Sequence, residues 1–353
     1  MPVHLRRAMA RFTKNAFLAA MEAFESAFPG EKPEDYYDPF ECGVIIGTGW
    51  GGIDETLESH DQFKEIGVGH PLGTLESMPS LPAATCSIFW NLRGYQNTPI
   101  AACATGCLAI GEGYQKIRYG QAKVMLVGGT ESLRSELNRW GIDVLGALSK
   151  EQEKAENACC PFDKKRSGFI LSEGAALLCL EEYESAKKRG AHILGEIVGF
   201  GSYSDARDFT APAEDLLARS KSITYALEEA GLKPEDIDYI NAHGTSTPLN
   251  DLNETETIKK ALGKTAYDIP ISSTKSYTGH LIAASGSFET IVCLKAMNEG
   301  LVPATINLHD PDPQCDLNYT PNNHLHKKID VALNLAFGFG GANAALILKR
   351  VPS

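Results

Sequence analysis

The segment Pro99-Ile100-Ala101-Ala102-Cys103-Ala104-Thr105-Gly106 decides the fold, because it joins three kinds of local structure. The apolar residues before the cysteine predict a short strand, and Cys103 lies at the tight turn that follows. Residues 106–119 have the apolar spacing of a helix. Apolar strands and helices alternate in the same way along the rest of the chain, which predicts an α/β fold.

The neighbouring segments continue this alternation. Apolar residues from Phe12 to Phe28 recur at helical spacing, and Pro29 and Gly30 end the expected helix. Val44-Ile45-Ile46 predicts a buried strand that runs into the glycine-rich turn 47–52. Further on, the pattern predicts strands at 123–127, 237–241, 269–272, 333–337 and 344–348, and helices at 222–231, 251–262 and 280–299.

A short internal repeat suggests two related halves. Lys32-Pro33-Glu34-Asp35 and Lys233-Pro234-Glu235-Asp236 each follow an expected helix and precede an expected strand. Four matching residues arise easily by chance, so the repeat alone supports a duplication only weakly.

Composition excludes several classes of protein. The chain has 353 residues, of which 43% are hydrophobic, and a net charge of −12, which argues against general binding to nucleic acid or to anionic membranes. No segment approaches the roughly 18 apolar residues of a membrane span, and the N-terminus lacks a secretory signal. We therefore expect a cytoplasmic protein.

Cysteines and glycines exclude further sites. The nine cysteines include no CxxC pair, so they suit neither a disulfide framework nor a structural zinc site, and we expect mostly buried thiols and no metal. The adjacent Cys159 and Cys160 are unusual, but neighbouring cysteines rarely bond to each other without strain. The turn 47–52 lacks both the Gly-Lys-Ser/Thr ending and the GxGxxG pattern of nucleotide sites.

Cys103 is the first candidate for chemistry. Free N–H groups and a partial positive charge at a helix N-terminus lower the pKa of a thiol, which leaves more nucleophilic thiolate at neutral pH. A small buried cysteine before a helix is the alternative interpretation.

Two histidines lie at the ends of expected elements. His243 follows the strand in Asn241-Ala242-His243-Gly244-Thr245-Ser246-Thr247-Pro248, and His280 begins the helix after Lys275-Ser276-Tyr277-Thr278-Gly279. Side chains at element ends in α/β proteins point into ligand crevices, whereas structural histidines more often lie within elements. The segment Phe337-Gly338-Phe339-Gly340-Gly341-Ala342-Asn343 is either a plain hairpin turn or a place where backbone N–H groups meet an anionic oxygen.

Together these motifs resemble the elongating β-ketoacyl-acyl-carrier-protein synthases of the thiolase-like superfamily, over about Arg6 to Leu348. Further matching segments are Ser272-Ser273-Thr274-Lys275-Ser276, Pro161-Phe162-Asp163 and Gly168-Phe169. The resemblance implies an α/β, thiolase-like fold of two similar halves stacked in layers, α-β-α-β-α. The N-terminal half, 1–195, would carry the cysteine, and the C-terminal half, 196–353, the two histidines.

The resemblance also implies roles for individual residues. Cys103 would accept an acyl chain from the phosphopantetheine thioester of an acyl carrier protein, and His243 and His280 would support decarboxylation of a malonyl thioester. Backbone N–H groups of Cys103 and Phe339 would form the oxyanion hole, with the Phe339 ring gating the acyl site. No metal or redox cofactor is implied, and the pattern of one cysteine and two histidines favours decarboxylative elongation over starter condensation or thiolysis.

Supporting roles follow from the same resemblance. Lys275, with Glu289 as its partner, would hold the histidine region electrostatically, although a structural ion pair is the alternative. Thr245 and Thr247 would bind the pantetheine arm, or would merely cap the turn. A homodimer, or a heterodimer with a related subunit, is implied.

The sequence departs from the family pattern at three places. Family members usually begin with a further segment whose glycine-rich strand lies centrally in the first sheet. We therefore expect that the given chain is a fragment, that another segment fills this position, or that the first sheet is incomplete. Trp50 replaces an aliphatic residue that lines the acyl tunnel, and we expect it to shorten that tunnel, unless its ring turns into a local core. Cys160 replaces an arginine that often assists carrier docking, so docking is expected to use a basic set made of Arg6, Arg7, Lys14 and Arg118.

Two other functions fit the same sequence. A non-catalytic partner subunit, comparable to a chain-length factor, would complete a heterodimer, although such partners usually lack the cysteine that this chain retains. A carrier-binding scaffold would bind carrier without reacting at Cys103.

Overall fold

A computed structural model describes residues 3–151 and 154–351, which fold into two compact units. Unit 1 comprises 1–140, 173–192 and 281–288, and unit 2 comprises 141–172, 193–280 and 289–353. Each unit is built from three separate segments of the chain. The single boundary expected at residue 195 stays a prediction. Within the described ranges, no helix has the length and the apolar character needed to cross a membrane.

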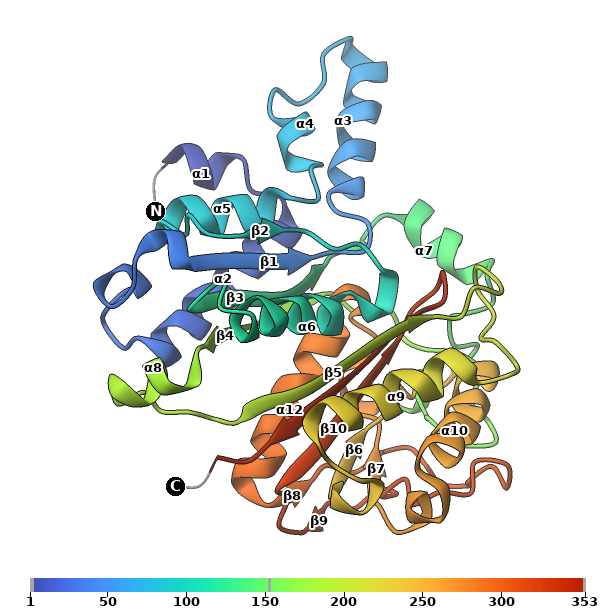
Figure 1. The fold of residues 1–353 in the computed structure, drawn as a ribbon. Coiled ribbons are helices and arrows are strands. Elements are labelled where there is room, and N and C mark those ends of the chain that lie inside the picture. Colours follow the sequence, from blue (N-terminus) through green and yellow to red (C-terminus); the bar gives the residue numbers. More distant parts are fainter. Residues whose placement is uncertain (1–2, 152–153, 352–353) are drawn as a thin grey trace. The chain divides into compact units, whose positions relative to one another are not determined.

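Unit 1 contains a four-stranded sheet in the order β2-β1-β3-β4 (Figure 1). The strands are β2 (Gln96–Asn97), β1 (Cys42–Gly47), β3 (Val124–Glu131) and β4 (Gly174–Glu181). β1 pairs in parallel with β2 and β3, and β4 runs antiparallel to β3. Because β1 and β3 are each paired on both sides, the sheet has no vacant position between its described strands, and the expected central gap is wrong.

Alternating side chains of the strands in unit 1 pack against helices on opposite faces of the sheet. Val44 and Ile46 of β1 belong to one buried cluster with Phe17 of α2 (Arg11–Ala27) and Cys86 of α5 (Leu81–Trp90). The intervening residues of the strands face α6 (Thr105–Arg118), where a Cβ on Gly47 would lie 2.1 Å from the Thr105 methyl. Because successive side chains of a strand point to opposite faces, helices can cover both faces of the sheet.

The strand expected at Pro99–Ala102 does not form. The observed strand β2 ends at Asn97, and residues 98–101 continue outside the sheet into the 3₁₀ turn η3 (Ala102–Ala104). β2 is an edge strand with two paired residues, and Pro99 has no N–H to extend the ladder. The other helices that begin in unit 1 are α1 (Val3–Arg7), α3 (Ile53–Ile66), α4 (Gly73–Glu76), α7 (Glu136–Asp143) and α8 (Tyr183–Lys188).

Unit 2 contains a five-stranded sheet in the order β5-β11-β10-β6-β7. The strands are β5 (Glu196–Ser204), β11 (Ala342–Lys349), β10 (Val331–Phe337), β6 (Tyr239–Asn241) and β7 (Ile271–Ser272). β6 pairs in parallel with β10 and β7, whereas β11 runs antiparallel to both of its neighbours. Helices α9 (Leu217–Ala230), α10 (Pro248–Leu262) and α11 (Lys275–Thr278) belong to this unit, and α12 (Ser285–Glu299) begins in unit 1.

Two glycines bring α9 close to β5. A Cβ on Gly199 would lie 2.1 Å from the Ala226 carbonyl oxygen, and one on Gly201 would lie 2.0 Å from that of Ser222. Only glycine allows this approach of helix to strand.

The internal repeat forms the same turn twice. Pro33–Asp35 (η1) and Pro234–Asp236 (η5) are 3₁₀ turns, and in each the aspartate accepts a 2.8 Å hydrogen bond from the N–H of the preceding lysine. The turns precede β1 and β6, which hold corresponding positions in the strand orders β2-β1-β3-β4 and β7-β6-β10-β11. Both sheets thus support the expectation of two similar halves.

Candidate active site

His243 is fixed by a carboxylate beneath its backbone. It lies just after β6, and the N–H groups of His243 and Gly244 donate to the two oxygens of Glu254 at 2.6 and 2.7 Å. Glu254 is fully buried on α10, and Gly244 adopts a positive φ of 37°. This forked contact sets the backbone direction, and hence the direction of the ring, without using an imidazole nitrogen.

Lys275 contacts the His243 ring. Its ammonium group lies 3.4 Å from His243 Nδ1 and forms an ion pair with the Glu289 carboxylate. Both charged side chains are about 1% exposed. Since an ammonium group can only donate, Nδ1 accepts and the ring proton resides on Nε2.

His280 lies beside His243. The ring centroids of the two histidines are 5.5 Å apart in an edge-to-face arrangement, and Phe169 packs edge-on against His280 at 4.8 Å. The backbone of His280 is held on both sides, because its N–H donates to Ile170 O at 2.7 Å and its carbonyl accepts from Ser172 N at 3.0 Å. The expectation that His280 begins the long helix is wrong, since a 3₁₀ turn (Ile282–Ala284) intervenes and α12 begins at Ser285.

Burial keeps both histidines neutral. It lowers the pKa of His243 well below 6.5, and the positive charge of Lys275 lowers it further. The pKa of His280 is lowered well below 6.5 for the same two reasons. Burial raises the pKa of Glu289 to about 7, against the opposing effect of Lys275. Neutral rings can each donate one N–H to a developing oxyanion without placing two like charges side by side.

Cys103 belongs to unit 1. It lies in the 3₁₀ turn Ala102–Ala104 directly before α6, and it is 7% exposed. Ala102 has a positive φ of 45°, which is an unfavourable conformation for a residue with a Cβ. The Thr105 hydroxyl accepts the Ala101 N–H at 2.9 Å and closes the turn. The cysteine is therefore presented on a strained, hydrogen-bonded turn at a helix N-terminus.

Two predicted pantetheine ligands contact each other. The Thr245 and Thr247 hydroxyls are 2.8 Å apart, and Thr245 is 5% exposed. Thr247 is the N-cap residue of α10, yet its side chain makes no capping bond. One hydroxyl donates to the other, which leaves the proton of the accepting hydroxyl for another partner.

Phe339 lies in the turn between β10 and β11. Gly338 N donates to Ala342 O at 2.7 Å, and Gly340 N donates to Phe209 O at 2.7 Å. Gly340 and Gly341 have positive φ values of 84° and 79°. In the described part of the chain, the Phe339 N–H has no hydrogen-bond acceptor, as an oxyanion donor requires.

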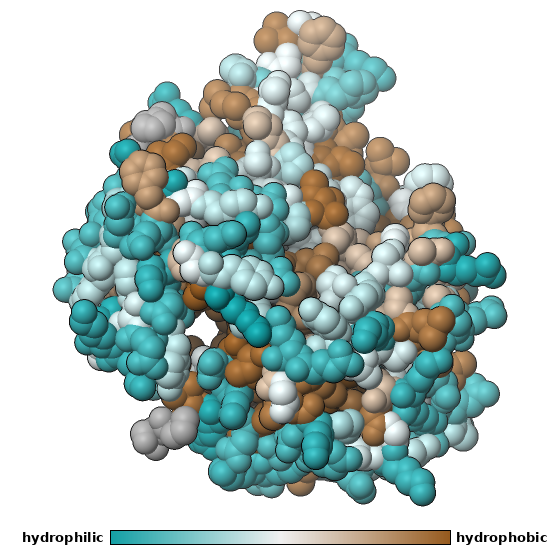
Figure 2. Space-filling model, in the orientation of Figure 1, coloured by the Kyte–Doolittle hydropathy of each residue, from teal (hydrophilic) through white to brown (hydrophobic). Residues whose placement is uncertain are grey.

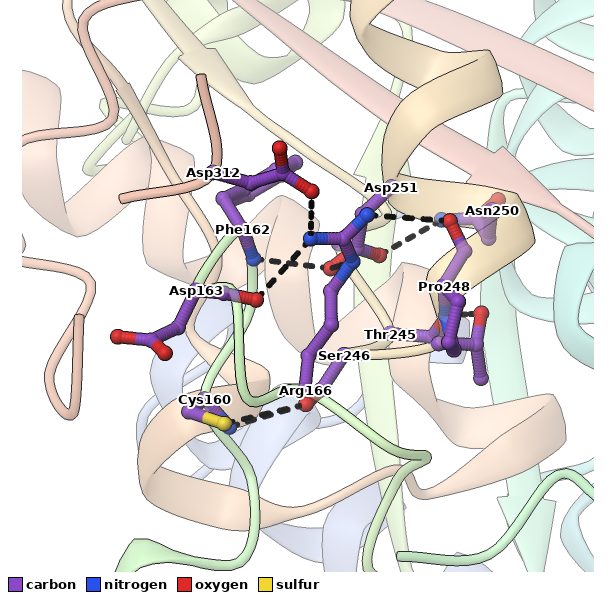
Figure 3. Close-up of polar contacts among 12 residues, drawn as sticks. Cys160, Phe162, Asp163, Arg166, Thr245, Ser246, Pro248, Asn250, Asp251 and Asp312 are labelled. Atoms are coloured by element: carbon purple, nitrogen blue, oxygen red, sulfur yellow. Dashed lines mark hydrogen bonds and ion pairs between the residues drawn. The ribbon is translucent and has the colours of Figure 1, made fainter. Parts of the chain in front are cut away.

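A buried polar network joins the loop after Cys160 to the loop after His243 (Figure 3). Arg166 donates to Asp312 at 2.7 Å, to the Asp163 carbonyl at 3.0 Å and to the Pro248 carbonyl at 3.2 Å. Asp251, whose pKa burial raises to about 7, accepts the Phe162 N–H at 2.9 Å. The network fixes the segment around Pro161-Phe162-Asp163 against the start of α10.

The remaining predicted residues are placed as follows. Arg6, Arg7 and Lys14 are exposed on α1 and α2 of unit 1, and Trp50 of the same unit is 38% exposed. Cys160 is buried, and its N–H donates to the Ser246 hydroxyl at 3.0 Å. The structure thus brings His243, His280, Lys275 and Glu289 together within unit 2, and it places Cys103, Trp50 and the basic side chains in unit 1.

Sequence reasoning missed several buried polar residues. Glu254 and Arg166 lie in polar segments that resemble a solvated helix face and a surface loop. Glu131, fully buried at the end of β3, was also missed. Only the spacing of Glu254, eleven residues after His243 on the following helix, could have suggested a link between them.

Comparisons with known proteins identify the family. Residues 3–186 match the family Beta-ketoacyl synthase, N-terminal domain, and residues 194–309 match the corresponding C-terminal domain. The chain is 43% identical over 312 residues to 3-oxoacyl-[acyl-carrier-protein] synthase 2 of Synechocystis, covering 88% of this chain and 75% of the relative. It is 39% identical to the Staphylococcus aureus protein of the same name over 346 residues, covering 98% and 83%.

Solved structures show the same fold. A type II polyketide ketosynthase bound to a hexaketide, in complex with its acyl-carrier protein, superposes with a TM-score of 0.92 at 34% identity, covering 97% of this chain and 85% of that one. A β-ketoacyl synthase from Burkholderia phymatum gives 0.91 at 34%, covering 99% and 85%. The expected α/β, thiolase-like fold class is confirmed, and the chain belongs to the β-ketoacyl synthase family.

Proposed function

We propose that this chain is a β-ketoacyl-acyl-carrier-protein synthase that condenses an acyl group held on Cys103 with a malonyl carrier. The observation that carries the proposal is the buried, neutral pair His243 and His280, with the Lys275 ammonium at Nδ1 of His243. This arrangement leaves the Nε2 proton of His243 for a substrate oxygen. The names of the curated relatives and the carrier complex of a similar ketosynthase support the same reaction.

Acyl transfer would come first. The Cys103 thiol gives up its proton, and the thiolate attacks the carbonyl carbon of an acyl thioester. The new C–S bond forms, the C–S bond to phosphopantetheine breaks, and the leaving sulfur takes up the proton from Cys103. Backbone N–H groups of Cys103 and Phe339 would stabilise the oxyanion of the tetrahedral intermediate. The phosphopantetheine arm arrives on the carrier protein, where Thr245 and Thr247 would hydrogen-bond it.

Decarboxylation and condensation would follow. When the bond from the malonyl carbon to its carboxylate breaks, carbon dioxide leaves and its electron pair forms an enolate. N–H groups of His243 and His280 would stabilise the enolate oxygen. The enolate carbon then attacks the acyl carbonyl carbon and forms the new C–C bond. The bond from that carbon to the Cys103 sulfur breaks, which releases the Cys103 thiolate and leaves the β-ketoacyl chain on the carrier.

Two exposed surfaces would bind partner proteins, one an acyl carrier protein and the other a second ketosynthase-like chain. The exposed Arg6, Arg7 and Lys14 would attract an acidic carrier protein. Apolar side chains exposed on the α3–α4 segment, seen in Figure 2 on the part that Figure 1 labels α3 and α4, would meet a second ketosynthase-like chain in the cytoplasm. They include Phe63, Ile66 and Val68. One similar solved structure is a ketosynthase with its chain length factor.

Mass spectrometry separates the two half-reactions. The protein is incubated with acyl carriers of several chain lengths, with Cys103→Ala as control, and malonyl carrier is then added. We expect an acyl mass on Cys103 that disappears as β-ketoacyl carrier forms. His243→Ala should still be acylated but should fail to release carbon dioxide. A folded, carrier-binding protein that takes up no acyl group would refute the proposal and favour the non-catalytic partner subunit.

A further inference from the structure

Glu131 is a buried carboxylate around which the glycine-rich turn folds. Its oxygens accept the Gly49 N–H at 2.7 Å, the Thr48 hydroxyl at 3.1 Å and the Trp50 N–H at 3.4 Å. Glu131 is fully buried at the end of β3. A Cβ on Gly49 would lie 2.4 Å from the Glu131 carboxylate, so the carboxylate itself requires glycine there.

The other side of the turn is also fixed. A Cβ on Gly52 would lie 2.1 Å from the Glu76 carbonyl oxygen, and one on Gly51, which has a φ of 60°, would lie 2.9 Å from Pro79. The turn is therefore clamped between Glu131 and the chain that leaves α4. Trp50 is its only large side chain and remains 38% exposed, so the clamped backbone sets the direction of the indole.

Among the residues that the structure describes, Glu131 forms no ion pair. Burial raises its pKa to about 7, and hydrogen bonds from Gly49, Thr48, Trp50 and Ser132 oppose that rise. On adjoining segments, Arg134 pairs with Asp54, and Arg11 pairs with Glu173. Within the described residues, the hydrogen bonds that stabilise the ionised carboxylate thus come from the turn and from the neighbouring Ser132.

We propose that Glu131 is a positioning residue for Trp50 and, through it, for the length of acyl chain that the enzyme accepts. The ionised carboxylate accepts every donor of the turn, whereas a carboxylic acid or an amide must present a hydrogen where an N–H already points. Loss of the charge therefore loosens residues 48–50 and frees the indole. The link from Trp50 to chain length rests on the proposed function and on the expectation from the sequence that Trp50 lines the acyl tunnel, whereas the link from Glu131 to Trp50 rests on neither.

The test follows Trp50 by a spectroscopic signal that needs no turnover. The three tryptophans of the full chain are labelled with 5-fluorotryptophan, and their ¹⁹F resonances are assigned with single Trp→Phe variants. We expect the Trp50 resonance to titrate with a midpoint near pH 7 and to lose that titration in Glu131→Gln. Asp251→Asn removes another buried carboxylate with a pKa of about 7, and it should leave the Trp50 titration unchanged.

Turnover provides the second measurement. In Glu131→Gln, the ratio of rates for long and short acyl carriers should change by about fivefold or more, because a tunnel wall discriminates chains by the space it leaves. A Trp50 resonance that titrates equally in both proteins, or in neither, would overturn the positioning role. An altered resonance with an unchanged ratio would overturn the link to chain length. An inactive wild type whose Trp50 titrates as expected would refute the proposed function and leave the positioning role standing.

Discussion

The ion pair of Lys275 and Glu289 offers a quantitative test of the site. Both residues are about 1% exposed, and the Lys275 ammonium also lies 3.4 Å from His243 Nδ1. We consider Lys275→Met, Glu289→Leu and the double variant. Each single change leaves one buried charged residue without its ion-pair partner, whereas the double change replaces the pair with apolar side chains of similar volume.

The expected magnitudes follow from burial. Removing one partner of a buried pair costs about 3–5 kcal/mol, whereas replacing both is often nearly neutral, so the coupling energy should be about 3 kcal/mol or more. In Lys275→Met the remaining Glu289 can take up a proton, because its pKa is already about 7 with the lysine present. An acid whose pKa is raised by folding contributes stability at low pH that is lost as pH rises. Lys275→Met should therefore be less destabilised at about pH 5.5 than at about pH 8.

Urea unfolding at the two pH values measures these free energies. A parallel assay of carbon dioxide release from malonyl carrier should show a loss of about 100-fold in Lys275→Met, because His243 loses the donor that fixes its tautomer. Acylation of Cys103 should persist in that variant. If the two single losses simply add in the double variant, or if acylation and decarboxylation fall together, the coupling described here is refuted.

Further predictions concern chain length, docking, packing and pH. Trp50→Ile should raise turnover of long relative to short acyl carriers by about tenfold, and equal ratios would contradict the tunnel role. Reversing Arg6 and Arg7 to Glu should weaken carrier binding at low salt and have less effect at high salt, as measured by calorimetry; unchanged affinity excludes that patch. Gly129→Ala should destabilise unit 1 by roughly 2 kcal/mol or more, because its Cβ would lie 2.1 Å from the Ala283 carbonyl oxygen. Gly141→Ala, with open space around it, is the matched control for urea unfolding. The folded state keeps both buried histidines neutral, so their contribution to stability is present above about pH 6.5 and lost as pH falls; an unfolding series should show a smaller loss in His280→Gln.

Local patterns were sufficient to predict many elements. Apolar periodicity predicted α2, β1, α6 and both closing strands, because burying a face requires apolar residues at the period of the element. The short repeat pointed to two related halves, and its two copies form the same 3₁₀ turn, since the proline and aspartate contacts that form each turn lie within four residues. The order of the short motifs along the chain likewise identified the family.

Tertiary structure decided what depends on residues distant in sequence. Whether Pro99–Ala102 joins a sheet depends on its neighbour, and β2 ends at Asn97 because it lies at an edge. The charged and polar residues Glu131, Arg166 and Glu254 resemble surface residues in sequence, yet backbone N–H and carbonyl groups from other segments satisfy them in the interior. A sequence pattern records the polarity of a side chain, whereas its burial and its partners are fixed only when distant segments pack together.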